Sequence, residues 1–446
     1  MIYDMLFDYQ KKTVNALKEY DSCGLFYDVG CGKTITSLAL YEDKLVRRLV
    51  DKLIVVCLFS KIEEWQKDIE HFFPFSKVLI FDGKDKTLRD FRKGDWDICI
   101  INFEKTWRNK DLYLISNRTM IIIDESHKIK DSETKIGKFM KAWETCTPYK
   151  IILTATPMSK GYIDIYNQFY FLGLLDMSLN EFKKKYCIEQ LVFFPGMKPF
   201  KKITGYRNTQ DLDLLIQRYT RYHKREIADN MLPEEIVIPI KIDSKYRKIM
   251  RDRVYEDIVL DKVSRKRLAD KSLCSGTIMG KTLVSENGEP LNRVYQLNKY
   301  KINWIKDFLE SFQERVVIYY LYDHQCEQLY NMIRDLDRPC ARYNSTYKEQ
   351  STFENNDNAV LLVQYKSGST GLDWLKSAYV EIFYTLPDSY IEFYQAKGRI
   401  NRIGQTHKPL YYILLAGDEK SADNLNYQAL LNQEDFTDDF YDRNFN

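Results

Sequence analysis

The sequence predicts an α/β protein with two lobes, each a parallel sheet flanked by helices, and a mainly helical insertion between them. Short apolar runs rich in β-branched residues alternate with amphipathic segments at the start of the chain, and the same alternation returns towards its end. This alternation is typical of a mostly parallel sheet covered by helices. The middle of the chain lacks it and is rich in lysine, arginine and glutamate. We therefore expect a first lobe at 1–170, a helical insertion and linker at 171–290, and a second lobe at 291–446.

The strands of both lobes are predicted from runs that are bounded by turn or polar residues. In the first lobe these runs are GLFYDV (24–29), KLIVVCLF (52–59), WDICIIN (96–102), MIIIDE (120–125) and KIILTAT (150–156). In the second lobe they are RVVIYYLY (315–322), AVLLVQY (359–365), YVEIFYTL (379–386) and LYYILLA (410–416). Between the lobes, VSENGEPLNR (284–293) is polar and rich in turn residues, which makes it the best candidate for a linker.

Length and composition exclude several classes of protein. A chain of 446 residues is long enough for two or three domains, and 44% hydrophobic residues allow each domain to bury a core. No apolar run is long enough to span a bilayer, and the first residues lack the pattern of a secretory signal. The nine cysteines include no CxxC pair, which argues against zinc and disulfides and favours a reducing cytoplasm. The net charge of +3 is close to balance, so nucleic acid must bind in a local groove if it binds at all.

A glycine loop follows the first predicted strand and opens a helix. Within FYDVGCGKTITSLAL (26–40) lie Gly30, Gly32, Lys33 and Thr34. Backbone N–H groups of such a loop surround phosphates, the lysine reaches the β- and γ-phosphates, and the hydroxyl holds Mg²⁺. The strict GxxxxGK[ST] pattern is not met, because Tyr27 stands at its first glycine. A glycine turn before a solvated lysine is therefore the alternative.

A pair of carboxylates ends a strongly apolar predicted strand. Asp124 and Glu125 lie at the end of this strand, where a parallel sheet presents its ligands. One carboxylate can organise Mg²⁺ while its neighbour polarises the attacking water. An N-cap for the following helix is the alternative for an isolated Asp–Glu pair, but the upstream glycine loop favours the catalytic interpretation.

Two arginines in the second lobe have helical spacing. Arg399 and Arg402 lie in QAKGRINRIGQTHKP (395–409), and residues at i and i+3 share one side of a helix. They form either a solvated basic face or a pair of arginine fingers that reach an ATP γ-phosphate from another domain. In the second case the catalytic site forms only when the lobes close, which couples hydrolysis to movement.

Four segments together resemble the motifs of superfamily 2 helicase-like ATPases, and their details resemble the SNF2 (Swi2/Snf2) branch. They are DVGCGKT, DESH, LTATP and QAKGRINRIGQ. Further segments similar to SNF2 motifs include LFDYQKKTVNAL, LIVVCLFSKIEEWQKDIEHF, WDICIINFEKT and STGLDW. EFKKKYC and ITGYRNTQDLDLLI resemble the small bacterial or phage-type members that are similar to fork-remodelling (annealing-helicase) proteins. The resemblance implies two RecA-like lobes that hydrolyse ATP between them.

The resemblance also implies a role for each matching residue, with ATP and Mg²⁺ as cofactors. The implied catalytic residues are Lys33, Glu125, Arg399 and Arg402. The implied nucleotide-binding residues are Gln10, Gly30, Gly32, Lys33, Thr34, Asp124 and Gln395, of which Thr34 and Asp124 hold Mg²⁺, partly through water. The implied coupling residues, which link the state of ATP to lobe movement, are His127, Thr154 and Thr156.

The chain departs from the family pattern at several positions. Phe7 replaces the arginine that is usual near the adenine-reading glutamine, and Tyr27 replaces a small residue of the phosphate loop. Gly368 and Gly371 stand where the family often has three glycines, and TLPD (385–388) replaces Asp-Trp-Asn-Pro. None of these changes removes a group from phosphate chemistry, so we expect an active ATPase.

Nucleic-acid contacts are predicted in both lobes. In this family the strand is held through its phosphates by backbone amides, hydroxyls and basic groups, which carry affinity but little sequence information. The candidates are Ser60 and Lys61 in the first lobe and Lys366, Ser367 and Gly368 in the second. A further candidate is the basic cluster Arg218, Arg221, Lys224 and Arg225, for which a solvated helix face is the alternative.

Three functions are compatible with these features. The first is a DNA-dependent ATPase that translocates along, or remodels, duplex or branched DNA in replication, recombination or repair. The second is a strand-separating superfamily 2 helicase on DNA or RNA. The sequence shows no recognisable wedge hairpin, which counts against this function. The third is a clamp that binds nucleotide and nucleic acid without turnover. Such a clamp does not need both Arg399 and Arg402, so their presence argues against it. We expect the first, in a monomeric cytoplasmic enzyme of bacterial or phage type, without zinc or membrane and with replication or recombination proteins as partners.

Overall fold

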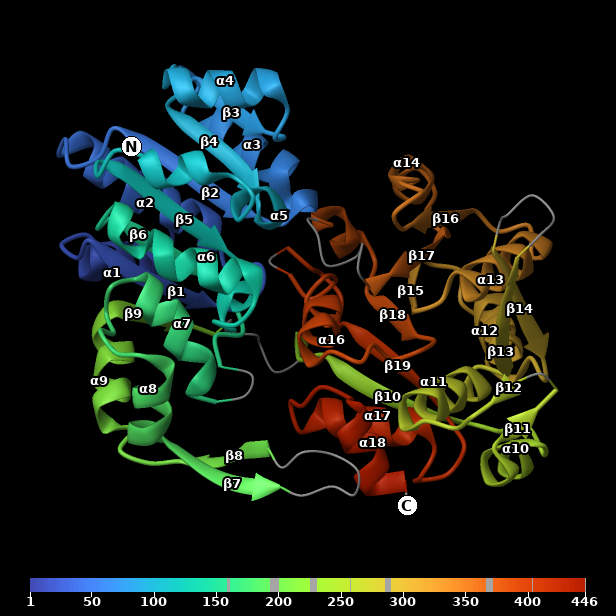
Figure 1. Ribbon diagram of the computed structural model, residues 1–446. Helices are drawn as coiled ribbons and strands as arrows, with labels where there is room; N and C mark the ends of the chain where they lie inside the picture. Colours follow the sequence, from blue (N-terminus) through green and yellow to red (C-terminus); the bar gives the residue numbers. More distant parts are fainter. Residues whose placement is uncertain are drawn as a thin grey trace. The chain divides into compact units, whose positions relative to one another are not determined.

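The protein is described by a computed structural model that covers residues 1–158, 161–192, 200–224, 231–256, 258–284, 290–365, 372–402 and 404–445 (Figure 1). The chain forms two compact units, Met1–Glu226 and Ile227–Asn446. Each unit contains a large parallel sheet flanked by helices, so the predicted α/β class with two sheet-based lobes is confirmed. Within the described ranges, no helix has both the length and the apolar character that crossing a bilayer requires.

The sheet of unit 1 has seven strands in the described residues, in the order β3-β4-β2-β5-β6-β1-β9, and its strand pairings are parallel. Its strands are β1 (Ser22–Tyr27), β2 (Lys52–Cys57), β3 (Val78–Phe81), β4 (Ile98–Asn102), β5 (Thr119–Asp124), β6 (Lys150–Leu153) and β9 (Thr220–His223). Each of the five predicted runs overlaps one strand, whereas β3 and β9 are not predicted. The central strands β2 and β5 are almost completely buried, which explains their continuous β-branched sequences.

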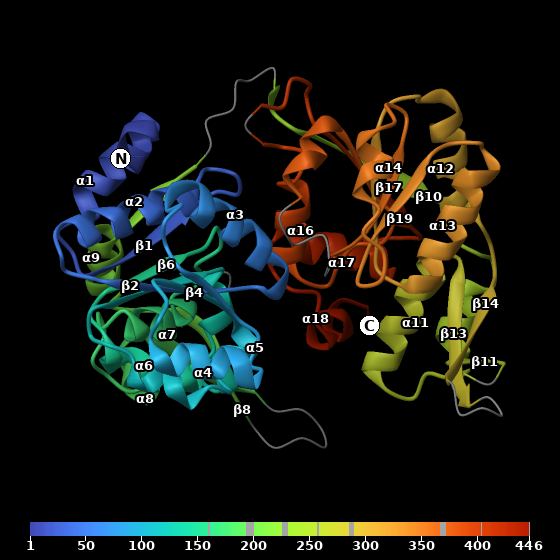
Figure 2. The ribbon, with the colours of Figure 1, turned by 90° about the horizontal axis from the view of Figure 1, so that it is seen from above.

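Helices cover both faces of this sheet (Figure 2). They are α1 (Asp8–Leu17), α2 (Lys33–Val46), α3 (Ile62–Phe72), α4 (Asp85–Lys93), α5 (Phe103–Thr106), α6 (Lys135–Trp143), α7 (Ile163–Phe171), α8 (Leu179–Tyr186) and α9 (Gln210–Tyr219). Alternate residues of β2 enter two separate cores: Val55 packs with α2 and α3, while Ile54 and Val56 pack with the cluster that contains α6 and α7. The sheet is therefore a rigid central layer from which its loops project.

An antiparallel hairpin that the sequence does not reveal extends from unit 1 next to α8 (Figure 1). Its strands are β7 (Cys187–Val192) and β8 (Phe200–Tyr206). Ile188 and Leu191 are about half exposed on β7, so the hairpin does not bury an ordinary apolar face. Its charged and apolar residues lack a clean period-two alternation, which is why the segment does not appear as a strand in the sequence.

The sheet of unit 2 has six strands among the described residues, in the order β10-β19-β18-β15-β17-β16, and their pairings are parallel. Its strands are β10 (Glu234–Ile240), β15 (Val316–Tyr320), β16 (Cys340–Tyr343), β17 (Val360–Gln364), β18 (Val380–Phe383) and β19 (Leu410–Ala416). The helices are α10 (Tyr246–Asp252), α11 (Val263–Cys274), α12 (Tyr300–Ser311), α13 (Asp323–Asp335), α14 (Gln350–Glu354), α16 (Tyr390–Lys397), α17 (Ala422–Leu431) and α18 (Asp438–Phe445). The four predicted runs of this lobe contain β15, β17, β18 and β19, whereas the edge strands β10 and β16 are not predicted.

The middle of the chain differs from the mainly helical segment expected at 171–290. It contains strands as well as helices, among them β9 in the first sheet and β10 in the second, and the two units divide near residue 226. Both strands lie at sheet edges and bury only some of their side chains, so they lack the continuous apolar run that identifies a central strand. The candidate linker 284–293 instead overlaps the end of β13 (Thr277–Val284) and the start of β14 (Pro290–Gln296), which pair as a hairpin, while its residues 285–289 lie outside the described ones.

Candidate nucleotide site

The glycine loop connects β1 to α2 at the edge of the sheet where the strands end. Gly30 has a φ of 79° and Gly32 a φ of 70°, in the left-handed region that disfavours other residues. A Cβ on Gly32 would also fall 2.3 Å from Gln10 Nε2. The loop conformation therefore favours glycine at position 32, and a Cβ there would also displace the Gln10 amide group.

Lys33 begins α2 and turns its ammonium group back towards the loop. Its Nζ donates hydrogen bonds to the carbonyl oxygens of Tyr27, at 3.0 Å, and Asp28, at 3.2 Å. Burial lowers the pKa of Lys33, and the charges of Glu125 and Asp124 oppose that shift. A cation that is poorly hydrated and held mainly by carbonyl groups is well suited to bind a phosphate.

The carboxylates predicted at the end of β5 are held in a fixed geometry. The amide N–H of Glu125 donates to one oxygen of Asp124 at 3.0 Å, and the indole N–H of Trp65 donates to the other at 3.0 Å. Glu125 adopts a left-handed φ of 55°, a strained conformation for a residue with a side chain. The turn after β5 thus aims two neighbouring carboxylates along different directions.

Glu125 and Asp124 have opposite pKa shifts. Burial acts to raise the pKa of Glu125, but the neighbouring imidazole of His127 and the charges of Lys33 and Lys61 lower it to about 2. Burial and the charge of Glu125 raise the pKa of Asp124. The lowered pKa keeps Glu125 ionised at neutral pH, as a residue that polarises water requires.

The three predicted coupling residues lie together beside Glu125. His127 Nδ1 is 3.2 Å from Glu125 Oε2 and 3.3 Å from Thr154 Oγ1. The amide N–H of Thr156 donates to Thr154 Oγ1 at 3.1 Å. One short network therefore joins the carboxylate turn after β5 to the turn after β6.

Gln10 and a group of aromatic rings lie on the other side of the glycine loop. Gln10 is 2% exposed, accepts from the amide of Phe7 at 2.9 Å, and donates to the Cys31 and Gly32 carbonyls at 3.4 Å. Tyr9 donates to the Cys31 carbonyl at 2.9 Å and stacks on His223, with ring centroids 3.7 Å apart. Neither Tyr9 nor His223 is predicted as a site residue. Tyr9 could have been found because it is next to the predicted Gln10, whereas His223 lies on β9, a strand that the sequence does not predict.

Tyr27, the bulky residue that departs from the expected loop pattern, belongs to the core. It is completely buried, and its ring packs edge-on against Tyr9 and His223, with centroids 5.9 and 5.6 Å away. Its side chain therefore stays within the protein, and only its backbone carbonyl contacts Lys33.

The residues of unit 1 fit Mg²⁺ and a nucleoside triphosphate. Thr34 supplies a hydroxyl in the first turn of α2 and Asp124 a carboxylate, and oxygen ligands of these kinds are the ones Mg²⁺ prefers. Glu125 places a second carboxylate beside Asp124, and its buried Oε2 lies 3.2 Å from His127 Nδ1. The N-terminus of α2 adds a favourable dipole for an anion.

In unit 2, Gln395 lies in α16, while the two predicted arginines lie in the turn that follows it. Helix α16 ends at Lys397 and Gly398 is its C-cap, so the expected helical alignment of Arg399 and Arg402 is not found. Glycine is a poor helix former, which accounts for the end of the helix there. Arg399 is 3% exposed and its Nε has no hydrogen bond within the described residues, whereas Arg402 Nε donates to the Gly398 carbonyl at 3.2 Å.

The predicted nucleic-acid contacts are described only in part. Ser60 and Lys61 end the short 3₁₀ helix Phe59–Lys61, directly before α3, and Lys61 Nζ lies 2.6 Å from Glu64 Oε2. Lys366, Ser367 and Gly368 lie outside the described residues, as does Arg225. In the basic cluster, Arg221 donates to backbone carbonyls at the end of α9, and Arg218 lies over the rings of Tyr20 and Tyr219. These contacts agree with a structural use of Arg218 and Arg221.

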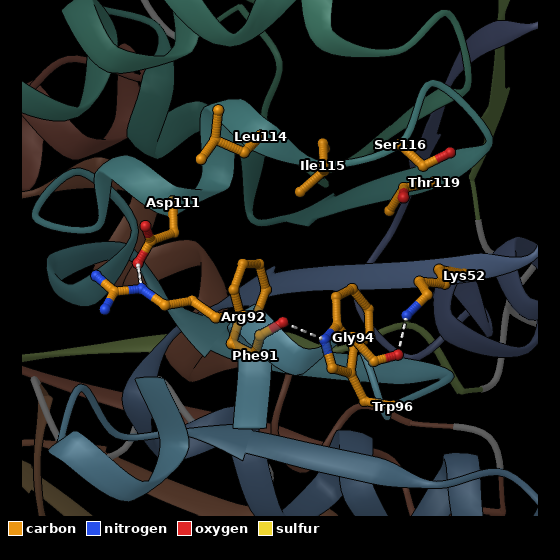
Figure 3. Close-up of a pocket in the computed structure, with 10 residues that line it drawn as sticks. All are labelled: Lys52, Phe91, Arg92, Gly94, Trp96, Asp111, Leu114, Ile115, Ser116 and Thr119. Atoms are coloured by element: carbon orange, nitrogen blue, oxygen red, sulfur yellow. Dashed lines mark hydrogen bonds and ion pairs between the residues drawn. The ribbon is translucent and has the colours of Figure 1, made fainter. Parts of the chain in front are cut away.

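A separate cavity of about 230 Å³ lies at the opposite ends of the strands (Figure 3). It is lined by Lys52 and Thr119, the first residues of β2 and β5, together with Phe91, Arg92, Gly94, Trp96, Asp111, Leu114, Ile115 and Ser116. Lys52 Nζ donates to the Gly94 carbonyl at 2.5 Å, and Arg92 Nε lies 3.0 Å from Asp111 Oδ2. Its cations are thus already paired, and it takes no part in the nucleotide site.

A glycine loop with its lysine and a strand-end carboxylate pair, on a parallel sheet flanked by helices, define the class of P-loop nucleotide-binding proteins. Residues 9–287 match the SNF2-related domain, and the chain belongs to this family. The resemblance to the SNF2 branch predicted from the sequence is thereby confirmed.

Relatives and a solved structure agree with this membership. The chain is 26% identical over 176 residues to the mouse "SWI/SNF-related matrix-associated actin-dependent regulator of chromatin subfamily A member 1", covering 37% of this chain and 16% of that protein. It is 20% identical over 422 residues to the "CHD3-type chromatin-remodeling factor CHR7" of Arabidopsis thaliana, covering 87% of this chain and 33% of that protein. The Hef helicase domain of Pyrococcus furiosus has the same fold, with a TM-score of 0.57, 13% identity, and coverage of 96% of this chain and 98% of that one. The chain thus spans a third or less of the length of these two curated relatives.

Proposed function

We propose that this protein is an ATP-dependent DNA translocase that hydrolyses ATP to move along duplex or branched DNA. The observation that carries the proposal is the convergence of Lys33, Asp124 and Glu125 at one edge of the unit 1 sheet, in a chain of the SNF2-related family. Relatives named as chromatin-remodelling factors and ATPases support it.

Each residue of unit 1 has a role in this proposal. Lys33 and the loop amides bind the phosphates. Gln10 and Tyr9 stabilise the loop by donating hydrogen bonds to the Cys31 carbonyl. Thr34 and Asp124 hold Mg²⁺, which when bound neutralises phosphate charge. The ionised Glu125 orients and polarises the attacking water.

The remaining site residues are proposed to couple ATP to movement of the lobes and to stabilise charge on the γ-phosphate. His127, Thr154 and Thr156 pass the state of the carboxylate turn to the turn after β6, through the contacts that already join them. Gln395, Arg399 and Arg402 are proposed as the residues of unit 2 that respond to ATP, with the arginines stabilising charge on the γ-phosphate. Ser60, Lys61, Lys366, Ser367 and Gly368 are proposed to contact DNA phosphates.

A strand-separating helicase is the second candidate, because the structure contains the β7–β8 hairpin. The strands β7 and β8, which the sequence does not predict, extend from unit 1 with partly exposed apolar side chains. A projecting hairpin is a means of parting two strands, so fork unwinding has to be measured beside translocation.

ATPase rates on single-stranded, duplex and forked DNA and on RNA test the proposal. We expect stimulation by duplex or forked DNA and a loss of about 10²-fold or more in Lys33→Ala, as for removal of a preorganised charge donor. Lys84→Ala, an exposed lysine of the same unit, is the control. A rate indifferent to DNA, or turnover that survives Lys33→Ala, contradicts the proposal. Displacement of a triplex strand without unwinding of a fork supports translocation, and unwinding supports the second candidate.

The proposed setting follows the sequence resemblance. We infer a monomeric enzyme of the small bacterial or phage type, working in the cytoplasm with replication or recombination proteins on branched DNA. Mass photometry with and without forked DNA tests the monomer, and a dimer on DNA contradicts it.

A further inference from the structure

Trp65 connects α3 to the carboxylate turn after β5. Its side chain is 1% exposed, and its indole N–H donates a hydrogen bond of 3.0 Å to Asp124 Oδ2 across 59 residues of sequence. The other oxygen of Asp124 accepts from the Glu125 amide at 3.0 Å. The carboxylate of Asp124 is therefore held from both sides, and Trp65 is the only side chain in the described residues with a recorded hydrogen bond to it.

The indole is itself immobilised by packing. Trp65 belongs to the apolar core that α3 forms with the sheet, together with Ile62 and Ile69 of the same helix and Val55 and Ile122 of the central strands. Rotation of the ring would open this core, so the position of its N–H is set by the position of α3. A movement of α3 along the sheet would change the hydrogen bond to Asp124.

The start of α3 is also where DNA contacts are proposed. Ser60 and Lys61 directly precede the helix, Lys61 is its N-cap, and Lys61 Nζ pairs with Glu64 in the first turn. Trp65 is the next residue after Glu64 in the same helix. The charge of Lys61 also acts on Asp124, Glu125 and Lys33. A phosphate bound at this helix start therefore lies about one helical turn from the residue that holds Asp124.

We propose that Trp65 is a positioning residue for the Mg²⁺-binding carboxylate of Asp124, and that α3 makes this hydrogen bond responsive to DNA bound at its N-terminus. This inference rests on the proposed function and specifies how DNA regulates the same site. A carboxylate freed from its indole donor loses the fixed orientation that a small, geometrically demanding cation requires. Loss of an outer hydrogen-bond partner of a metal ligand costs about 10- to 100-fold in metal affinity or activity.

The decisive variant is Trp65→Phe, which removes the N–H donor and keeps a large aromatic ring in the core. Trp143→Phe is a matched control. Trp143 is also completely buried in unit 1, and its indole N–H donates at 2.8 Å to the Leu112 carbonyl, away from the carboxylates. Both variants lose one buried indole hydrogen bond, so a difference between them reports the location of that bond and not the loss of a tryptophan.

The measurement is the affinity for Mn²⁺ in the complex with the non-hydrolysable analogue β,γ-imido-ATP, followed by electron paramagnetic resonance of free Mn²⁺. We expect the Kd for Mn²⁺ to rise about tenfold or more in Trp65→Phe and to stay within about twofold of wild type in Trp143→Phe. In wild type, a saturating DNA duplex should change that Kd by about fivefold or more, and Trp65→Phe should abolish the change. DNA binding in the absence of nucleotide should be equal in all three proteins.

Each outcome decides one part of the proposal. Equal Mn²⁺ affinity in Trp65→Phe and Trp143→Phe overturns the positioning role. A raised Kd with an intact response to DNA supports positioning and overturns the link through α3. Absence of DNA-stimulated hydrolysis in wild type overturns the proposed function, while the Mn²⁺ comparison of the two variants still judges Trp65.

If Trp65→Phe fails to fold, the indole N–H resonance of Trp65 in wild type replaces it. The chain has six tryptophans, so substitution of the other five identifies this resonance by elimination. We expect it to shift on addition of Mg²⁺ with the analogue and again on addition of duplex DNA. A resonance that responds to neither overturns the proposal.

Discussion

Ser126 Oγ donates a hydrogen bond of 2.7 Å to Gln168 Oε1 in the interior of unit 1. The amide group of Gln168 in turn donates to the Pro157 carbonyl at 3.0 Å and to the Asp164 carbonyl at 2.7 Å. Gln168 is completely buried in α7. One side chain therefore joins the turn that carries Glu125 to the segment that follows Thr154 and Thr156.

Replacing Gln168 by leucine should destabilise unit 1 and slow ATP hydrolysis. The substitution leaves the Ser126 hydroxyl and the Pro157 carbonyl buried without this partner, which costs about 1–3 kcal/mol per group. Urea unfolding of the full chain, followed by hydrogen exchange of α7 peptides, measures the loss. Gln66→Leu is the control, because the one side-chain hydrogen bond of Gln66 within the described residues goes to Glu70, on the exposed side of α3. If the two variants are equally stable, the buried hydrogen bonds of Gln168 contribute nothing to the free energy of unfolding.

Tyr27 should affect stability and not nucleotide chemistry. Tyr27→Ala removes a fully buried ring and should lower the free energy of unfolding of unit 1 by about 3–5 kcal/mol. Tyr27→Phe should change it by less than about 1 kcal/mol, because the hydroxyl has Thr13 and Thr36 nearby but makes no hydrogen bond of good geometry in the described residues. Titration with a fluorescent ATP analogue at a temperature where both variants are folded should give wild-type affinity. A selective loss of affinity in Tyr27→Phe would assign the hydroxyl to the nucleotide.

Glu381 is a buried carboxyl group whose removal should stabilise unit 2. It lies in β18 opposite Val317 and Tyr411 of the neighbouring strands, and neither oxygen has a hydrogen-bond partner among the described residues. Burial raises the pKa of Glu381 well above its usual range, although the charge of Arg399 opposes the shift. Glu381→Leu should raise the free energy of unfolding by about 1–3 kcal/mol, because it removes an unpaired buried polar group.

Glu381→Gln is the matched variant for this test. Below the raised pKa of Glu381 this substitution exchanges one neutral polar group for another, so the free energy of unfolding should change little there. Hydrogen exchange of the β18 segment in the full chain distinguishes the two substitutions. Destabilisation by leucine alone would mean that the carboxyl makes an interaction that the apolar side chain cannot replace.

Asp270 should make the stability of unit 2 depend on pH. It is fully buried in α11 and accepts hydrogen bonds from Tyr246 at 2.9 Å and Tyr441 at 2.7 Å. Burial raises the pKa of Asp270 to about 6, although the hydrogen bonds from Tyr441, the Ala422 amide and Tyr246 oppose the shift. Because the pKa is higher in the folded state, the contribution of Asp270 is fully present below about pH 4 and is lost as the pH rises through about 6.

The test is the difference in unfolding free energy between wild type and Asp270→Asn as a function of pH. Asparagine stays neutral, so wild type should lose about 2 kcal/mol relative to the variant between pH 4 and pH 7, and little more above it. Hydrogen exchange of α11 peptides in the full chain reports this unit separately. A constant difference across that range would show that Asp270 titrates alike in the folded and unfolded chain.

The parts of the site that are continuous in sequence could be predicted. Gly30, Gly32 and Lys33 stand between a strand and a helix, and Asp124 and Glu125 end a buried strand, so their shared edge follows from the rule for parallel sheets. His127 and Thr154 could be placed near them only through the family resemblance. Their contact, at 3.3 Å, depends on how closely two strand-end turns approach each other.

What the sequence determined by itself was the class of fold, the central strands and the glycine loop between β1 and α2, because each depends on local spacing and on the periodicity of apolar residues. Tertiary structure alone decided that Trp65 holds Asp124, that Gln168 holds Ser126, and that His223 stacks on Tyr9. These partners lie far apart in the chain and meet on edge strands or between packed helices, where side-chain directions depend on the whole core. The division of the middle segment between two sheets has the same cause, since an edge strand is recognisable only by the strand beside it.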